Sequence, residues 1–148
     1  MKLLPVEYIQ ARRNYLLFKN DTGVTDMARR GAIYEHYIFD YCRQHLNLEG
    51  KNVIDIGANF GFHSLEFADF IGNGHIYAFE PQRLVYYQLC GNIIANGLDN
   101  ITALNVALGD KFDTLKVENP DYHANEIINI GNSHLDAYTH INYDFIWI

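Results

Sequence analysis

The alternation of apolar and polar positions is clearest in the middle of the chain. Residues 53–56 form a β-branched run that only Asp55 interrupts, as expected of a strand covered on both faces. Residues 62–71 follow with apolar side chains at helical spacing, and this pattern stops at the Gly-Asn-Gly sequence of residues 72–74. The pattern therefore predicts a strand, a turn over residues 57–61 and a helix.

Three further strands are predicted after this unit. Residues 75–79 and 101–108 are expected to be parallel strands, and the helix between them ends at Asn-Gly, residues 96–97, which is a C-cap signal. Residues 143–148 are expected to form the last of these strands. Alternating strands and helices predict an α/β fold with a mainly parallel sheet.

The amino-terminal part of the chain carries a weaker pattern. Residues 1–20 show a weak helical pattern, and residues 26–46 show a stronger one that Gly31 weakens near its start. We therefore predict a helical extension over residues 1–48 and a cofactor-binding domain over residues 49–148.

The turn after the first predicted strand carries the candidate chemistry. Gly57 and Gly61 leave bare backbone there, against which a ligand can lie. A strand, a glycine turn and a helix N-terminus together form a nucleotide-cofactor site in α/β proteins. The NAD fingerprint needs glycines at its first, third and sixth positions, but Asn59 and Phe62 occupy the third and sixth counted from Gly57. A dinucleotide oxidoreductase is therefore disfavoured, and no Gly-Lys-Ser/Thr follows that would indicate a P-loop.

What remains is a Gly-Ala-Asn-x-Gly turn preceded by Asp55. This arrangement suits a cofactor that has no phosphate but has a cationic or amino-acid end, because the carboxylate can interact with an ammonium group directly or through water. S-adenosylmethionine has these features. The residues expected around it here are Asp55, Gly57, Ala58, Asn59 and Gly61, although Asn59 has the alternative role of tolerating a left-handed turn.

The next strand ends at a second acidic residue, Glu80, which lies 25 positions after Asp55 (80 − 55). An acidic residue there can accept hydrogen bonds from both ribose hydroxyls. Its alternative role is a charge that favours the following helix N-terminus, where Pro81 is expected to fix φ. Ala107 and Leu108 end the third strand and are expected either to flank the adenine or to pack the strand end.

Together these blocks resemble the FkbM-type family of S-adenosylmethionine-dependent methyltransferases. The resemblance covers about residues 21–148. The Asp-x-Gly-Ala-Asn-x-Gly and Ala-Phe-Glu-Pro blocks are typical of class I methyltransferases, and residues 107–110 and 135–136 narrow the match to this family. The matching segments, in chain order, are VIDIGANFGFHSLEFA, IYAFEP, NGLDNITALNVALGD, HLDAY and YDFIWI.

The resemblance implies O-methylation of a hydroxyl on a sugar or on another small or glycan-linked substrate. It implies a Rossmann-like three-layer sandwich, of which this chain supplies strands 3, 2, 1 and 4 of the order 3-2-1-4-5-7-6, the cofactor-binding half. It also implies that Tyr34 and Glu35 close over the cofactor, whereas Tyr34 could equally be a core residue. His63 is a candidate base with a structural role as its alternative.

The sequence departs from this family at its carboxyl end. Trp147 stands where a Lys-Ile-Asp-x-Glu-Gly-type block usually begins, and the sequence stops at Ile148. We therefore expect a C-terminally truncated domain whose catalytic base is unassigned. The alternative is a non-catalytic cofactor-binding or interaction module. The resemblance also places residues 143–148 as a parallel strand beside residues 53–56, and without a fifth strand its apolar edge would be exposed. We therefore expect the chain to self-associate through that edge, to pair with a partner strand, or to be poorly soluble and catalytically silent.

Charge and composition limit the classes of partner and ligand that this chain is expected to bind. A net charge of −7 and a pI near 5.3 give no electrostatic footprint for nucleic acid or an anionic membrane. No run approaches the roughly 18 apolar residues of a membrane span, and residues 1–13 lack the apolar core of a signal peptide. Cys42 and Cys90 are expected to be reduced in a cytoplasmic protein, and the seven histidines lack metal-ligand spacing, so no metal is expected.

Overall fold

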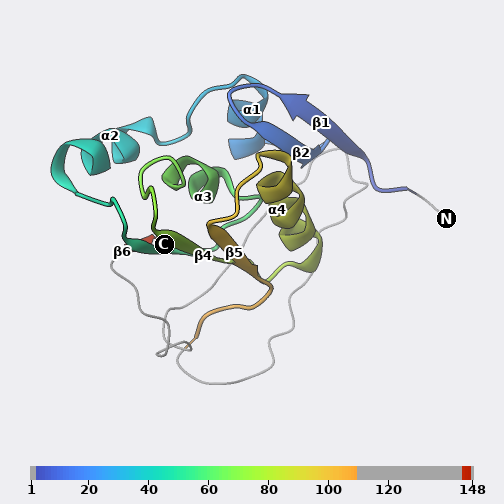
Figure 1. Cartoon of the computed structure of the whole chain (residues 1–148). Helices are drawn as coiled ribbons and strands as arrows, with labels where there is room; N and C mark the ends of the chain where they lie inside the picture. Colours follow the sequence, from blue (N-terminus) through green and yellow to red (C-terminus); the bar gives the residue numbers. More distant parts are fainter. Residues whose placement is uncertain (1–2, 110–144, 148) are drawn as a thin grey trace.

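The computed structural model of the chain describes residues 3–109 and 145–147, which form an α/β fold with two sheets (Figure 1). The elements, in chain order, are β1 (Val6–Gln10), β2 (Asn14–Phe18), α1 (Val24–Arg29), α2 (His36–His45), β3 (Asn52–Ile56), α3 (Phe62–Phe67), β4 (His75–Phe79), α4 (Arg83–Ala95), β5 (Ile101–Leu104) and β6 (Phe145–Trp147).

The main sheet is parallel and has the strand order β5-β4-β3-β6. Val53 of β3 pairs with Ile76 of β4 on one side and with Phe145 of β6 on the other. This arrangement is Rossmann-like and confirms the predicted strand order. The strand that precedes the glycine turn, β3, lies in the interior of the sheet. Because all four strands run in the same direction, the turn after β3 and Glu80 after β4 meet at one edge of the sheet.

The described helices pack against one face of this sheet (Figure 1). Val53 and Ile76 share the main core cluster with side chains from all four helices. On the opposite face, Ile54, Phe79 and Leu108 belong to a separate apolar cluster. The described residues therefore supply one of the two helical layers expected of a three-layer sandwich.

The predicted helical pattern over residues 1–20 is wrong, because β1 and β2 form an antiparallel hairpin there. Exposure alternates along β1, and β2 buries Tyr15 and Leu17 in the main core. Aromatic and branched side chains favour this half-buried pleated surface, and their tertiary packing overrides a weak helical period. The predicted helix over residues 26–46 is split into α1 and α2, with left-handed backbone at Gly31 (φ 67°) and Glu35 (φ 53°).

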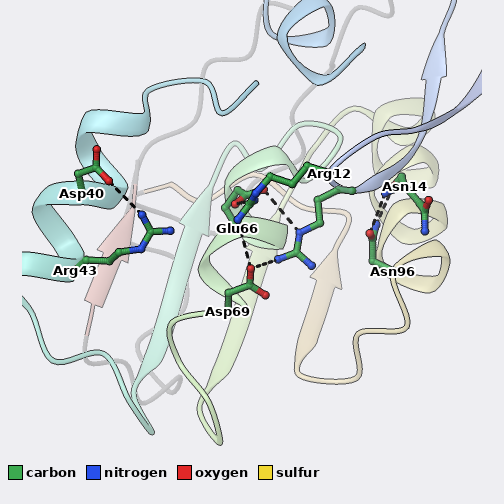
Figure 2. Close-up of polar contacts among 8 residues, drawn as sticks. Arg12, Asn14, Asp40, Arg43, Glu66, Asp69 and Asn96 are labelled. Carbon is green, nitrogen blue, oxygen red and sulfur yellow. Dashed lines mark hydrogen bonds and ion pairs between the residues drawn. The ribbon is translucent and has the colours of Figure 1, made fainter. Parts of the chain in front are cut away.

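The hairpin is fastened to α4 by two asparagines. The Asn92 amide donates to the Phe60 carbonyl at 2.8 Å, and its oxygen accepts from the Leu16 N–H at 2.5 Å. Asn96 bonds both backbone groups of Asn14, at 2.7 and 3.0 Å (Figure 2). These side chains satisfy backbone groups of β2 that β1 does not pair, as buried polar groups require.

Charged residues fasten the turn of the hairpin to α3 (Figure 2). Arg12 forms an ion pair with Glu66, whose side chain is only 2% exposed, and Arg13 lies 2.5 Å from Asp69. Because a buried carboxylate needs a compensating charge, the hairpin turn completes the packing of α3. The amino-terminal hairpin is therefore part of the fold that carries the glycine turn.

Replacing Asn92 with leucine tests the importance of this junction. The change keeps the number and branching of the side-chain heavy atoms but leaves the Leu16 N–H and the Phe60 carbonyl without these partners. We expect the free energy of unfolding to fall by roughly 2–4 kcal/mol, the cost of leaving two buried polar groups unpaired. Urea denaturation of the variant and of wild type measures this difference.

Ile94→Ala provides a matched control on the same helix, because this side chain is 77% exposed. It should change the unfolding free energy by less than about 0.5 kcal/mol. Equal stability of Asn92→Leu and wild type would show that the hairpin does not depend on this bridge.

Candidate functional site

The glycine turn is held against the end of β4. The N–H groups of Gly57 and Ala58 both donate to the Phe79 carbonyl at 2.9 Å. Three of its residues are left-handed, Gly57 at φ 76°, Asn59 at φ 51° and Gly61 at φ 94°, so the tolerance expected of Asn59 is observed. A Cβ on Gly61 would lie 2.7 Å from Leu89 of α4, so a glycine there also allows α4 to approach closely.

Glu80 connects this turn to the loop that leads into α4. Its Oε2 accepts from the Asn59 N–H at 3.0 Å, and its Oε1 accepts from the Gln82 N–H at 2.8 Å. The side chain is 3% exposed. Burial raises the pKa of Glu80 to about 7, and the two N–H bonds oppose that rise. Each carboxylate oxygen keeps acceptor capacity for a second donor.

Asp55 is directed toward α3. It is 1% exposed and accepts a hydrogen bond from the Ser64 hydroxyl. Burial raises the pKa of Asp55, while the Ser64 bond and the neighbouring His63 lower it. Ser64 is a site residue that sequence reasoning missed. A serine two positions into a helix gives no local sign that it will reach a carboxylate on the adjacent strand.

The loop after β4 contains an unpaired acceptor. Gln82 is 3% exposed, and its Oε1 has no hydrogen-bond partner among the residues described. Pro81 precedes the N-cap Gln82, and the helix begins at Arg83, so Pro81 lies just outside the helix that it was expected to start. Asn105 donates to the carbonyls of Glu80 (2.8 Å) and Pro81 (3.1 Å), which holds this loop to the end of β5.

Of the two residues predicted to end β5, Leu108 packs against apolar neighbours. The strand ends at Leu104, four residues before the predicted end at Leu108. Leu108 is 3% exposed and packs in the cluster with Ile54 and Phe79, while Ala107 is partly buried. A role for Ala107 and Leu108 beside the adenine stays a prediction.

Two further candidates lie at the start of α3. His63 Nε2 is 3.1 Å from a carboxylate oxygen of Glu35. The His63 ring stacks on Phe39, with centroids 5.7 Å apart, and also lies 6.0 Å from the ring of Tyr34. Tyr34 and Glu35 therefore lie against α3, the helix that follows the glycine turn. The contacts of His63 are those of a packed residue.

A pocket of about 190 Å³ lies between the glycine turn and the loop before α1. Sequence reasoning identified only Asn59 among its residues, because the burial of a polar loop depends on tertiary packing. The residues that line it are Asp21, Thr22, Gly23, Val24, Thr25, Asn59 and Phe60. Asp21 is 3% exposed and Thr25 is 1% exposed.

This arrangement fits the expected nucleoside cofactor. The Glu80 carboxylate has lone pairs left for ribose hydroxyls, and the unpaired Gln82 oxygen can accept from a further donor. Gly57 and Gly61 bring bare backbone to the same edge of the sheet. Asp55, Gly57, Ala58, Asn59, Gly61 and Glu80 are thus gathered at the carboxyl ends of β3 and β4, as predicted.

Among known proteins, the chain matches solved structures only. No family model matches the chain, and no curated protein matches it. A SAM-dependent O-methyltransferase from Thermotoga maritima is 21% identical over 74% of this chain and 43% of its own, with a TM-score of 0.49. TYW2 from M. jannaschii, in complex with AdoMet, is 21% identical over 74% of this chain and 49% of its own, with a TM-score of 0.47.

A SAM-dependent methyltransferase from Aquifex aeolicus is 18% identical over 62% of this chain and 50% of its own, with a TM-score of 0.47. The chain spans half or less of the length of these three solved proteins. Likenesses at this level assign neither a family nor an activity to it, so both depend on the residues of the chain itself.

The raised pKa of Glu80 predicts how stability depends on pH. Its ordinary value is 4.5 and its value in the fold is about 7. Between these values the unfolded chain has lost the proton and the folded chain has kept it, so the unfolding free energy falls as pH rises. We expect wild type to lose up to roughly 3 kcal/mol relative to Glu80→Gln between pH 5 and pH 8.

Urea denaturation of both proteins at several pH values measures this difference, and Glu80→Gln is the control because an amide does not titrate. Carboxylates that do not interact with Glu80 cancel in the comparison, whereas Asp55, whose charge helps to raise the pKa of Glu80, does not cancel fully. Parallel pH profiles for the two proteins would contradict the assigned burial of Glu80.

Proposed function

We propose that this chain is an S-adenosylmethionine-dependent methyltransferase domain of FkbM type that methylates a hydroxyl on a sugar or on another small or glycan-linked substrate. The observation that carries the proposal is the Glu80 carboxylate, which joins the glycine turn to the end of β4 through the Asn59 and Gln82 N–H groups. This places an acidic acceptor beside bare backbone, as a nucleoside cofactor requires.

Each part of the site then has a stated role. Glu80 accepts from the ribose hydroxyls, and the backbone of Gly57 and Gly61 packs against the cofactor. Asp55, held by Ser64, provides negative charge near the amino-acid end. Ala107 and Leu108 flank the adenine. The Gln82 oxygen accepts from the base, which would satisfy an atom that has no described partner.

The bound cofactor supplies an activated methyl group. The protein positions the acceptor oxygen in line with it and keeps water away. A hydroxyl acceptor must also lose a proton to a base. The reaction therefore depends mainly on how the acceptor is held against the glycine turn.

A non-catalytic cofactor-binding module is the alternative. The chain covers half or less of the length of the solved proteins compared above, so binding and turnover are separate proposals. Formation of S-adenosylhomocysteine with hydroxylated acceptors would favour the enzyme. Tight binding without turnover would favour the module.

The location of the protein, its class of substrate and its self-association are also part of the proposal. No helix among the described residues is both long and apolar enough to cross a membrane. We place the protein in the cytoplasm, acting on a small-molecule or glycan hydroxyl and on no nucleic acid. In the described part of the sheet β6 is an edge strand, and self-association through that edge belongs to the proposal.

Removing the Glu80 carboxylate tests the cofactor assignment. Glu80→Ala deletes the proposed ribose acceptor, so affinity for S-adenosylhomocysteine should fall by roughly 1.5–3 kcal/mol, the usual contribution of a hydrogen bond to a charged group. Isothermal calorimetry of wild type and variant gives this value directly. Gly57→Val should bind more weakly still, because its side chain enters the cofactor's path and its φ of 76° disfavours a branched residue.

Glu49→Ala is the control, since this exposed carboxylate precedes β3 at the opposite end of the strand. It should bind like wild type. Equal affinities of wild type and Glu80→Ala would refute the ribose assignment, and tighter binding of NAD than of S-adenosylhomocysteine would refute the choice of cofactor.

A further inference from the structure

The pocket beside the glycine turn has a feature that the proposed cofactor site does not use. Its lining comes from residues 21–25, which are the loop before α1 and the first two residues of that helix, and from Asn59 and Phe60. The Asn59 N–H bonds to Glu80, so a residue that lines the pocket is joined directly to the proposed ribose acceptor. The pocket therefore lies next to the cofactor site.

Thr25 is one of the lining residues, and it is the most deeply buried of the polar ones. The residue is 1% exposed, and its Oγ1 has no hydrogen-bond partner among the residues described. A buried hydroxyl without a partner destabilises a fold relative to an apolar side chain of the same shape. A bound ligand that pairs with the hydroxyl would remove this penalty.

The loop is held in place before any ligand arrives. Arg29 donates from its Nη1 to the Asp21 carbonyl at 2.7 Å and from its Nη2 to the Phe18 carbonyl at 2.9 Å. Arg29 is itself fixed by Glu7 of β1 at 2.7 Å. A loop fixed in this way loses little conformational freedom when a ligand binds.

The chemistry of the lining selects the ligand. Asp21, Thr22, Thr25 and Asn59 contribute a carboxylate, two hydroxyls and an amide, and the lining contains no Lys, Arg or His. An anionic group would find no opposite charge here. A neutral hydroxyl fits, because it can donate to the carboxylate, which only accepts, and can both donate to and accept from the hydroxyls and the amide.

We propose that this pocket holds a hydroxylated part of the methyl acceptor and that Thr25 is a specificity-determining residue for it. The inference rests on the proposed function. Asn59 is shared with the proposed cofactor site, but the acceptor is favoured over the cofactor's own ribose because Glu80, the proposed ribose acceptor, does not line the pocket. Both ligands carry hydroxyls, so the test has an arm for each.

The test compares Thr25→Val with wild type and uses Thr25→Ser as the control that keeps the hydroxyl. The probes are S-adenosylhomocysteine and, with that cofactor saturating, methyl glycosides of the common hexoses, all measured by calorimetry. The melting temperature of each variant is also measured. Thr25→Val should melt at or above the wild-type temperature, because it removes an unpaired buried hydroxyl.

In Thr25→Val, the Kd for S-adenosylhomocysteine should stay within about twofold of wild type, while the Kd for the best-bound glycoside should rise about fivefold, the loss of one hydrogen bond. Thr25→Ser should keep most of the glycoside affinity. No saturable glycoside binding to wild type, or an unchanged glycoside Kd in Thr25→Val, would overturn the inference.

A weaker cofactor Kd in Thr25→Val would assign the pocket to the ribose and would also overturn it. So would a clearly lowered melting temperature, which would give the hydroxyl a structural partner. Failure of wild type to bind S-adenosylhomocysteine would instead refute the proposed function, so the two failures are distinguishable.

Discussion

The site depends on one buried carboxylate that two backbone N–H groups share. Glu80 bonds Asn59 in the glycine turn and Gln82 before α4, so it fixes the separation of two loops that follow adjacent strands. Buried backbone donors must be paired, and here a single side chain pairs both. The same burial raises the pKa of Glu80 to about 7, so the geometry of the site and its charge are coupled.

The glycine turn is also fixed from its other side, by the amino-terminal hairpin. Asn92 of α4 bonds both the Phe60 carbonyl in the turn and the Leu16 N–H in β2. Arg12, in the turn of the hairpin, also neutralises the buried Glu66 of α3. The hairpin thus contributes to the rigidity of a site built from residues 55–61 and 80–82, and residues 21–25, which follow it, line the adjoining pocket.

Local sequence features were sufficient to predict the strands of the main sheet, the glycine turn and the position of Glu80, because β-branched runs and glycines act over a few residues. The order of the strands was predicted from the family resemblance instead. They failed at the hairpin, where packing of Tyr15 and Leu17 against the core overrides a weak helical period. They also missed Ser64, Gln82 and Thr25. Polar residues of this kind gain their roles only when distant segments bury them, and no local pattern records that burial.

The central claim is that the Glu80 bridge marks a cofactor site for S-adenosylmethionine. An NMR titration of the ¹⁵N-labelled protein with S-adenosylhomocysteine tests it most directly. The amide signals of Asn59 and Gln82 should shift together and saturate, because both N–H groups bond the carboxylate that receives the ribose, while the amide of Arg12 in the hairpin turn should stay in place. Saturable binding that leaves the Asn59 and Gln82 amides unmoved would contradict the claim.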